Sequence, residues 1–235
     1  HYNNLQDLRK DCFTNSNFLK LYKKFCPGPI TFVLKLKKES KISKYVTNKR
    51  NTLAVRFPKH VVLKYLLKKL NYPLAAPSVN ISSKLSAVCS SDVKEDFGKK
   101  IKFVLEGGRS SIGIESTIID LTKKPKILRL GGLKINKINR VLKKNIIKDI
   151  NPSKIYAPGQ FKLHYSPGLP IRLNAKKAKD NEAYIILKKT KTIKSNYYFL
   201  SKDGSLKEAA KNLYSTLRKI KNIKFKSIAI KSIPN

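Results

Sequence analysis

Residues 27–36 have the sequence Pro-Gly-Pro-Ile-Thr-Phe-Val-Leu-Lys-Leu. The two prolines and the glycine end any helix that precedes them. The alternation of apolar and polar residues from Ile30 to Leu36 is typical of a strand. Upstream, apolar residues at helical spacing predict a helical segment from Leu5 to Phe25. A helix that is followed by a strand across a sharp turn predicts a domain of the α/β class.

The same alternation of strands and helices continues to about residue 142. We expect further strands at residues 52–57, 73–77, 102–106, 116–121 and 127–130. We expect amphipathic helices at residues 60–70 and 135–142. These elements predict a first domain over residues 1–150.

Residues 151–172 are rich in Pro and Gly and show no periodicity, which is typical of an interdomain linker. Beyond the linker, strands are expected at residues 184–187, 197–200 and from 226 onward. A capping box at Ser205 and Glu208 opens a helix that extends to about Ile220. Residues 173–235 are therefore expected to form a smaller, partial α/β domain with a parallel sheet.

The chain carries a formal net charge of +38, which favours contact with nucleic acid because basic side chains neutralise phosphates. The lysines are, however, spread from end to end, and they fit solvated surfaces as well as a dedicated RNA-binding surface. Both interpretations stay open. Arginine is scarce in this background, so each Arg deserves inspection as a planar bidentate donor.

Three cysteines without C-x-x-C spacing argue against a zinc site and against a disulfide scaffold, and they fit a reducing cytoplasm. No apolar run has the length of a membrane span, and no cleavable signal is visible. The three His residues lack metal-site spacing. Because Met is absent, we expect the chain to be a fragment or a processed product.

The sequence lacks a P-loop, a G-x-G-x-x-G motif after a strand, an H-E-x-x-H motif and a G-x-S-x-G motif. What remains is a set of polar and arginine-bearing turns placed after expected strands, where α/β sheets build their sites. This set is Arg56, Ser78, Asn80, Ser116, Thr117 and Arg129. Ser and Asn at such positions also cap turns. A buried Arg needs an anionic partner, and Glu115 or Asp120 could supply it internally.

His60 is expected to begin a helix and His164 to order the linker.

Six stretches in this order resemble the threonylcarbamoyl-AMP synthase family, also called YrdC-like, in its long two-domain form. They are residues 25–34, 52–58, 75–80, 113–120, 128–132, and 157–159 together with 164–167. Residues 200–204 and 209–214 look like the extra domain of that form. The resemblance implies a YrdC-like twisted mixed sheet with flanking helices, plus a smaller, partial Rossmann-like α/β domain. It also suggests that the chain is truncated at both ends.

The resemblance implies that L-threonine, bicarbonate and ATP give threonylcarbamoyl-AMP and pyrophosphate, for threonylcarbamoyladenosine modification of tRNA. ATP with Mg enters as a substrate complex, and neither a prosthetic group nor a protein nucleophile is needed, so no catalytic residue is assigned. The implied ATP contacts are Thr52, Ser78, Asn80, Ser86, Arg129 and Tyr165. The implied threonine contacts are His1, Arg56, Ala76 through its backbone, and Ser116.

By the same resemblance, the linker with Tyr165 would act as a lid that excludes water from the nucleotide. A downstream threonylcarbamoyl transferase and a weak contact with tRNA are the implied macromolecular partners, and no membrane is involved. The family's Lys-x-Arg motif would lie upstream of His1, so we expect this piece alone to be inactive. Val79 stands where the family usually has Ala. Two alternatives remain: an RNA-binding module of the same fold without catalysis, and a relative that uses another carbamoyl acceptor.

Overall fold

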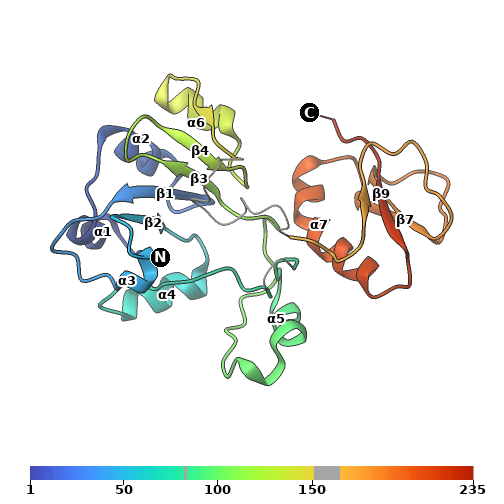
Figure 1. Ribbon diagram of the computed structural model, residues 1–235, viewed down its shortest axis with the longest axis horizontal. Coiled ribbons are helices and arrows are strands. Elements are labelled where there is room, and N and C mark those ends of the chain that lie inside the picture. The colour runs from blue at the N-terminus through green and yellow to red at the C-terminus, as the bar shows by residue number, and fades with distance from the viewer. Residues whose placement is uncertain (82–83, 151–164, 235) are drawn as a thin grey trace. The chain divides into compact units, whose positions relative to one another are not determined.

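The computed structural model describes residues 1–81, 84–150 and 165–234 (Figure 1). Its contacts divide the described residues into two compact units. The first contains residues 1–77 and 115–150, and the second contains residues 78–114 and 165–234. Residues 78–114, which the sequence analysis assigns to the first domain, thus group with the C-terminal elements. The boundaries expected at residues 150 and 172 stay a prediction.

The first unit is built on a mixed sheet. Strand order is β2-β1-β3-β4-β5, with antiparallel β1–β2 and β3–β4 pairs and parallel β1–β3 and β4–β5 pairs. The strands are β1 (Ile30–Lys35), β2 (Thr52–Arg56), β3 (Thr117–Asp120), β4 (Lys126–Arg129) and β5 (Ile147–Lys148). The first four confirm expected strands, and the mixed α/β class is confirmed. The two-residue β5 is too short for a sequence pattern to predict.

Five helices belong to this unit among its described residues: α1 (Leu5–Asp11), α2 (Ser16–Phe25), α3 (Lys44–Thr47), α4 (Val61–Lys69) and α6 (Ile135–Leu142). The segment expected to be helical over residues 5–25 is helical, with a break that the sequence did not predict. It is two helices, because Cys12 leaves the first to form a β-bridge with Leu36 and Asn15 caps the second. His60 caps α4 through its ring nitrogen, as expected.

One face of the mixed sheet carries the main core of this unit. Helices α1, α2 and α6 cover it with Leu8, Phe18, Leu21, Ile138 and Leu142. The matching strand residues are Ile30, Phe32, Leu34, Leu53, Val55, Ile119 and Ile127. Burial of each such side chain contributes about 1.5–3 kcal/mol. Because side chains alternate along a strand, the intervening residues of β1 and β2 point to the opposite face. That face holds the candidate site.

Two expected strands, at residues 73–77 and 102–106, are wrong. Pro73 and Pro77 have no N–H to donate to a ladder, and among the described residues the backbone hydrogen bonds of this segment join Leu74 to His1. In the second segment, Phe103 and Leu105 are 88% and 62% exposed, so their apolar alternation does not face a core. Both segments are coil in the structure.

The second unit contains a four-stranded parallel sheet in the order β6-β9-β7-β8. Its strands are β6 (Ile171–Arg172), β7 (Glu182–Lys188), β8 (Tyr197–Ser201) and β9 (Ser227–Ile230). The long helix α7 (Leu206–Lys221) follows β8, and α5 (Ser90–Phe97) leads into a 3-10 turn at Gly98–Lys100. The smaller α/β domain is thus confirmed, although β6 begins inside the expected linker and α5 was not predicted.

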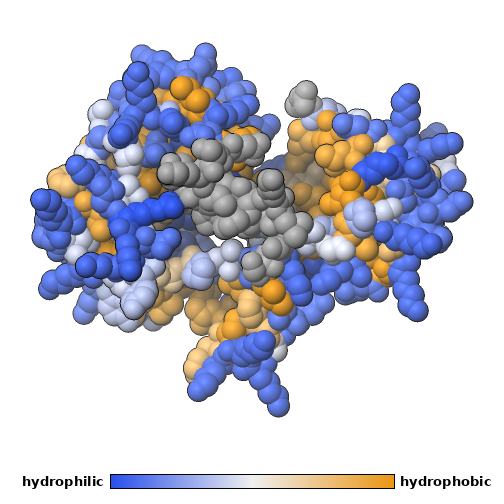
Figure 2. Space-filling view, in the orientation of Figure 1, coloured by the Kyte–Doolittle hydropathy of each residue, from blue (hydrophilic) through white to orange (hydrophobic). Residues whose placement is uncertain are grey.

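Ser205 caps α7 as the capping box predicts, because its hydroxyl accepts a hydrogen bond from the Glu208 N–H. The Glu208 carboxylate accepts from Lys202 N–H and from the hydroxyl of Ser201 instead of closing the box on Ser205. None of the described helices is long and apolar enough to cross a membrane. Figure 2 shows hydrophilic side chains over most of the visible surface of each unit.

Candidate functional site

A row of side chains crosses the first sheet at the end of β2. The strand register pairs Arg56 with Thr31, Thr31 with Ile118, and Ile118 with Arg129. Residues that lie side by side on neighbouring strands point to the same face. Two arginines on separate strands are therefore brought to one edge of the sheet with a threonine between them.

Arg56 is held in place by a hydrogen bond to the backbone. Its Nε donates to the carbonyl oxygen of Gly28 at 3.3 Å. Burial, together with the positive charge of Arg129, lowers the pKa of Arg56. Within the part of the chain that the structure describes, no carboxylate lies within ion-pair distance of Arg56. Asp120 accepts from Thr122, so Asp120 is not the internal partner that the sequence allowed for Arg56.

Arg129, at the other end of the row, is bound to Ser116. The Arg129 Nε and Nη2 donate to the Ser116 carbonyl at 3.1 and 3.0 Å, and Nη2 also donates to the Ser116 hydroxyl at 3.2 Å. Ser116 is 5% exposed, and its hydroxyl lies 2.7 Å from the hydroxyl of Thr31. A continuous polar chain thus runs from Arg129 through Ser116 to Thr31.

Thr31 is the member of this group that the sequence analysis missed. Its signal was present, because Thr31 occupies the polar phase of the β1 alternation directly after the Pro-Gly-Pro turn. What was lacking was the pairing register, which places it opposite Arg56. Register depends on contacts between distant segments, so a local pattern does not give it.

Close backbone approach fixes the position of Ser116. A Cβ atom on Gly131 would lie 2.4 Å from the Glu115 carbonyl oxygen, so this position requires glycine. The Gly132 N–H donates to the same oxygen at 2.8 Å. The Thr117 N–H donates to the carbonyl of Pro29. The turn after β4 and the turn before β1 therefore hold residues 115–117 between them.

His1 lies beside Arg56. The N–H of Tyr2 donates to the Arg56 carbonyl at 3.0 Å, and His1 exchanges backbone hydrogen bonds with Leu74. The buried Nδ1 of His1 has no hydrogen-bond partner among the described residues. The backbone at His1 and Tyr2 is therefore held against the end of β2, where Arg56 lies.

Two other predicted contacts of this unit do not join the row. Thr52 begins β2, four residues before Arg56, which corresponds to about 13 Å along a strand. Ala76 lies in the exposed coil at residues 73–77. Their assignments to ATP and threonine stay predictions.

The remaining predicted ATP contacts, Ser78, Asn80, Ser86 and Tyr165, belong to the second unit. The Asn80 amide nitrogen donates to the carbonyls of Ile81 and Lys84, so Asn80 does stabilise its own turn, as the simpler interpretation expects. The buried Oδ1 of Asn80 has no hydrogen-bond partner among the described residues. Residues 157–159 and His164 lie outside the described residues, so the lid hypothesis stays a prediction.

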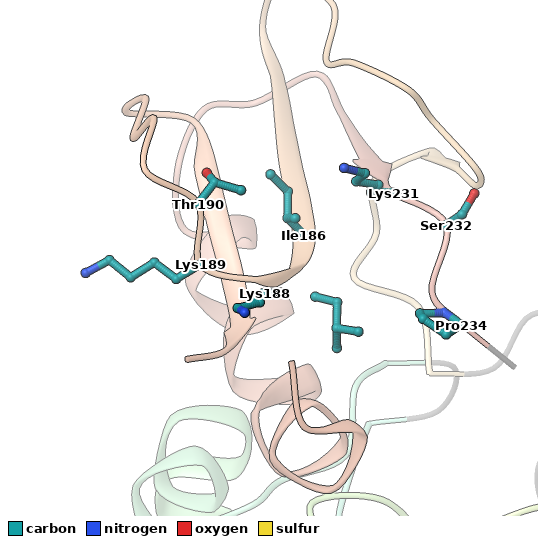
Figure 3. Close-up of a pocket in the computed structure, with 8 residues that line it drawn as sticks. Ile186, Lys188, Lys189, Thr190, Lys231, Ser232 and Pro234 are labelled. Atoms are coloured by element: carbon teal, nitrogen blue, oxygen red, sulfur yellow. The ribbon is translucent and has the colours of Figure 1, made fainter. Parts of the chain in front are cut away.

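A cavity of about 200 Å³ lies at the carboxyl ends of β7 and β9 (Figure 3). It is lined by residues 186–190, Lys231, Ser232 and Pro234. None of the residues that the sequence assigned to a site contributes to it. The predicted site residues therefore lie away from this cavity, in the row on the first sheet and among the polar residues of the second unit.

The row has the composition of an anion site. Two guanidinium groups and two hydroxyl groups at the end of a buried sheet suit a carboxylate or a phosphate, which accepts several charge-assisted hydrogen bonds. The geometry thus defines an α/β protein with a candidate anion-binding site on its mixed sheet and a second, parallel-sheet domain.

Comparison with family models agrees with this architecture. Residues 1–131 match the Sua5/YciO/YrdC model, described as "Telomere recombination", and residues 133–235 match the model described as "Threonylcarbamoyl-AMP synthase, C-terminal domain". The chain belongs to the Sua5/YciO/YrdC family.

Similar proteins include three threonylcarbamoyl-AMP synthases. The one from Pyrococcus abyssi is 39% identical over 158 residues, covering 64% of this chain and 45% of the relative. The one from Schizosaccharomyces pombe is 34% identical over 209 residues, covering 83% of this chain and 48% of the relative. The one from Bacillus subtilis is 32% identical over 157 residues, covering 65% and 45%. The chain thus spans about half the length of the curated relatives it matches.

Solved structures give the same result. The crystal structure of P. abyssi Sua5 complexed with L-threonine matches with a TM-score of 0.87 and 28% identity, covering all of this chain and 74% of that one. The structure of Escherichia coli YciO matches 57% of this chain and 66% of its own, with a TM-score of 0.51 and 26% identity. The two-domain α/β fold expected from the sequence is therefore confirmed.

Proposed function

We propose that this chain carries the substrate-binding residues of an L-threonylcarbamoyladenylate synthase. The threonine amine and bicarbonate combine with loss of water to give a carbamate. A carbamate oxygen then attacks the α-phosphorus of ATP. The bond from that phosphorus to the bridging oxygen breaks, and its electron pair leaves with pyrophosphate. The names of the three relatives, and the threonine complex of P. abyssi Sua5, support this proposal.

The observation that carries the proposal is the row Arg56–Thr31–Ile118–Arg129. Arg56 has no carboxylate partner among the described residues and lies in the field of a second guanidinium. An amino-acid carboxylate would supply the missing negative charge through a bidentate pair. We assign the rest of threonine to the Ser116 hydroxyl and to Nδ1 of His1, which has no hydrogen-bond partner among the described residues.

ATP enters with Mg²⁺ as the second substrate. We assign its binding to Thr52, Ser78, Asn80, Ser86, Arg129 and Tyr165. No protein group needs to form a covalent intermediate, because holding the carbamate in line with the α-phosphate supplies much of the rate. The protein's own contribution is orientation and cationic stabilisation of the charge that develops on the phosphate oxygens.

The mixed anhydride product would pass to a threonylcarbamoyl transferase that modifies tRNA.

Cys12, Cys26 and Cys89 are free thiols, and burial raises the pKa of both Cys12 and Cys26 to about 12. Cysteines that stay unpaired fit a reducing compartment, and we propose the cytoplasm.

The test is product formation by the full-length protein. Labelled bicarbonate, L-threonine, ATP and Mg²⁺ should give labelled threonylcarbamoyl-AMP and an equal amount of pyrophosphate, and omission of any one should abolish the product. Absence of product with all four present would overturn the proposal. RNA binding that falls steeply with salt and ignores ATP and threonine would instead favour the RNA-binding module.

A further inference from the structure

Residues 84–113 pack against the C-terminal domain. Leu85 and Val88 are 3% and 6% exposed, and they belong to one core cluster with residues of β7, β8, β9 and α7. Gly113 approaches α7 so closely that a Cβ atom there would lie 2.5 Å from the backbone of Lys211. The segment that carries Ser86 is thus built into the hydrophobic core of the second unit.

Arg218 of α7 makes the polar part of this contact. Its two terminal nitrogens bind both carboxylate oxygens of Asp96, at 3.1 and 2.5 Å, and Nη2 also donates to the Leu85 carbonyl at 3.1 Å. The Arg218 and Asp96 side chains are only 11% and 8% exposed. A guanidinium that is buried and bidentate in this way fixes geometry far better than a surface ion pair does.

Arg218 also acts on the other side of Ser86. Its Nε lies 3.8 Å from a carboxylate oxygen of Asp92, and that same oxygen accepts from the Val88 N–H at 2.7 Å. The guanidinium therefore holds the Leu85 carbonyl directly and the Val88 amide through Asp92. Ser86 lies between these two anchored positions.

One helical turn before Arg218, Tyr214 contacts Tyr165, a second residue that the sequence analysis assigns to ATP binding. Its ring centroid lies 5.7 Å from that of Tyr165. Residues four apart lie on the same face of a helix. Lys84 forms a parallel β-bridge with Ser166, so the segment around Ser86 and the segment around Tyr165 are also joined to each other.

We propose that Arg218 is a positioning residue for the nucleotide, through which the C-terminal domain sets the geometry of Ser86 and Tyr165. The inference rests on the proposed function, since it assumes that these two residues bind ATP. Burial of a charged pair is costly, and an apolar pair could replace it without loss of stability. Its role in this position is to fix the conformation of residues 84–88.

The first test compares Arg218→Gln with Arg172→Gln in the full-length protein. Arg172 pairs with Glu182 and donates to the Lys177 carbonyl in the same domain, and no hydrogen bond or ion pair among the described residues joins it to residues 84–88, so it is the matched control. Arg218→Gln should raise the KM for ATP about tenfold or more while the KM for threonine stays unchanged, because displacement of a binding group by about 1 Å has effects of this size. Arg218→Lys keeps the positive charge but cannot form the bidentate pair, so its KM for ATP should lie between those of wild type and Arg218→Gln.

The second test does not depend on turnover. Hydrogen exchange of the amides at residues 84–88 and 165–166 should become faster in Arg218→Gln and in Asp96→Asn, and remain unchanged in Arg172→Gln. Gly113→Ala should have the same effect as Arg218→Gln. Gly108→Ala should not, because Gly108 has a similar φ of +70° but open space around its Cβ position.

These outcomes separate the two proposals. If wild type forms no product, the proposed synthase fails and the nucleotide role of Arg218 fails with it, whatever the exchange rates. If wild type turns over while Arg218→Gln keeps its KM for ATP and its exchange pattern, the positioning role alone is wrong. A change in the KM for both substrates in equal measure would also contradict it, because that indicates general loss of structure.

Discussion

Two arginines, one in each unit, differ in whether a carboxylate neutralises them among the described residues. In the second unit, Glu182 accepts from Arg172 at 2.6 Å, from the Lys179 N–H at 2.8 Å and from the Ser227 hydroxyl at 3.0 Å. The Arg172 pair holds the pKa of Glu182 at about 2. In the first unit, Arg56 faces Arg129 and has no carboxylate partner among the described residues.

The difference separates groups that stabilise the fold from groups that bind a ligand. A carboxylate with several donors around it lowers the free energy of the folded state and has no capacity left for a substrate. Two neighbouring cations that the fold keeps together cost stability, and an arriving anion removes that cost. The predictions below are ordered by the size of the effect they expect.

The largest effect is expected from Arg56→Gln. It should lower kcat/KM for threonine on the order of a hundredfold or more, because it removes a charge-assisted pair at a mostly desolvated position. Its free energy of unfolding should equal or exceed that of wild type, since repulsion from Arg129 is removed. Steady-state kinetics with varied threonine and urea unfolding measure the two quantities. A variant that is both active and less stable would show that Arg56 is structural.

Glu182→Gln should show the reverse pattern. Loss of the charge on Glu182, which has a side chain only 7% exposed, should lower the free energy of unfolding by about 1.5–3 kcal/mol. Turnover per folded molecule should not change. Urea unfolding followed by circular dichroism measures the free energy of unfolding. Activity normalised to the amount of folded protein measures the turnover per folded molecule. A stable variant with reduced kcat would place Glu182 in the reaction instead.

The acid sensitivity of the second unit should depend on the same carboxylate. The folded pKa of Glu182 is about 2, below its ordinary value of 4.5, so its contribution to stability is complete above about pH 4.5. It is lost as the pH falls from there toward 2. Between pH 5 and pH 2.5, wild type should therefore lose more free energy of unfolding than Glu182→Gln does. Parallel losses in the two proteins would contradict the assigned pKa.

The smallest effect expected is stabilisation by a simple anion. Sulfate at a concentration a few times its Kd should raise the Tm by roughly 2–4 °C, which corresponds to about 1 kcal/mol for a chain of this size. Sodium chloride at equal ionic strength is the control for general screening. The difference between the two salts should vanish in Arg56→Gln and persist in Arg172→Gln. An equal rise in all proteins would mean that sulfate acts on the surface as a whole.

The sequence predicted the fold where local patterns carry it. The alternation around Phe32 gave β1, and an arginine within an apolar strand marked Arg56 as a position that needs an anion. The segment at residues 73–77 failed, because apolar residues between two prolines cannot join a ladder. In the sequence, Thr31 was one polar residue in an alternating strand, and only the β1–β2 register places it beside Arg56.

The grouping of Ser86 with the C-terminal domain was not predictable from local patterns. It depends on contacts between Arg218 and Asp96, which are 122 residues apart in the chain. Leu85 and Val88 belong to the short segment Leu-Ser-Ala-Val-Cys at residues 85–89, and nothing in its neighbourhood indicates which core they enter. Motif order along the chain therefore located the candidate residues but not the structural unit that holds each of them.

The central claim is that Arg56 binds the carboxylate of threonine. Calorimetric titration of the protein with L-threonine and with L-threoninamide tests it most directly, because the two ligands differ mainly at that carboxylate. Wild type should bind threonine at least about tenfold more tightly than threoninamide. In Arg56→Gln this preference should disappear. Equal binding of both ligands by wild type, or an unchanged preference in the variant, would contradict the account.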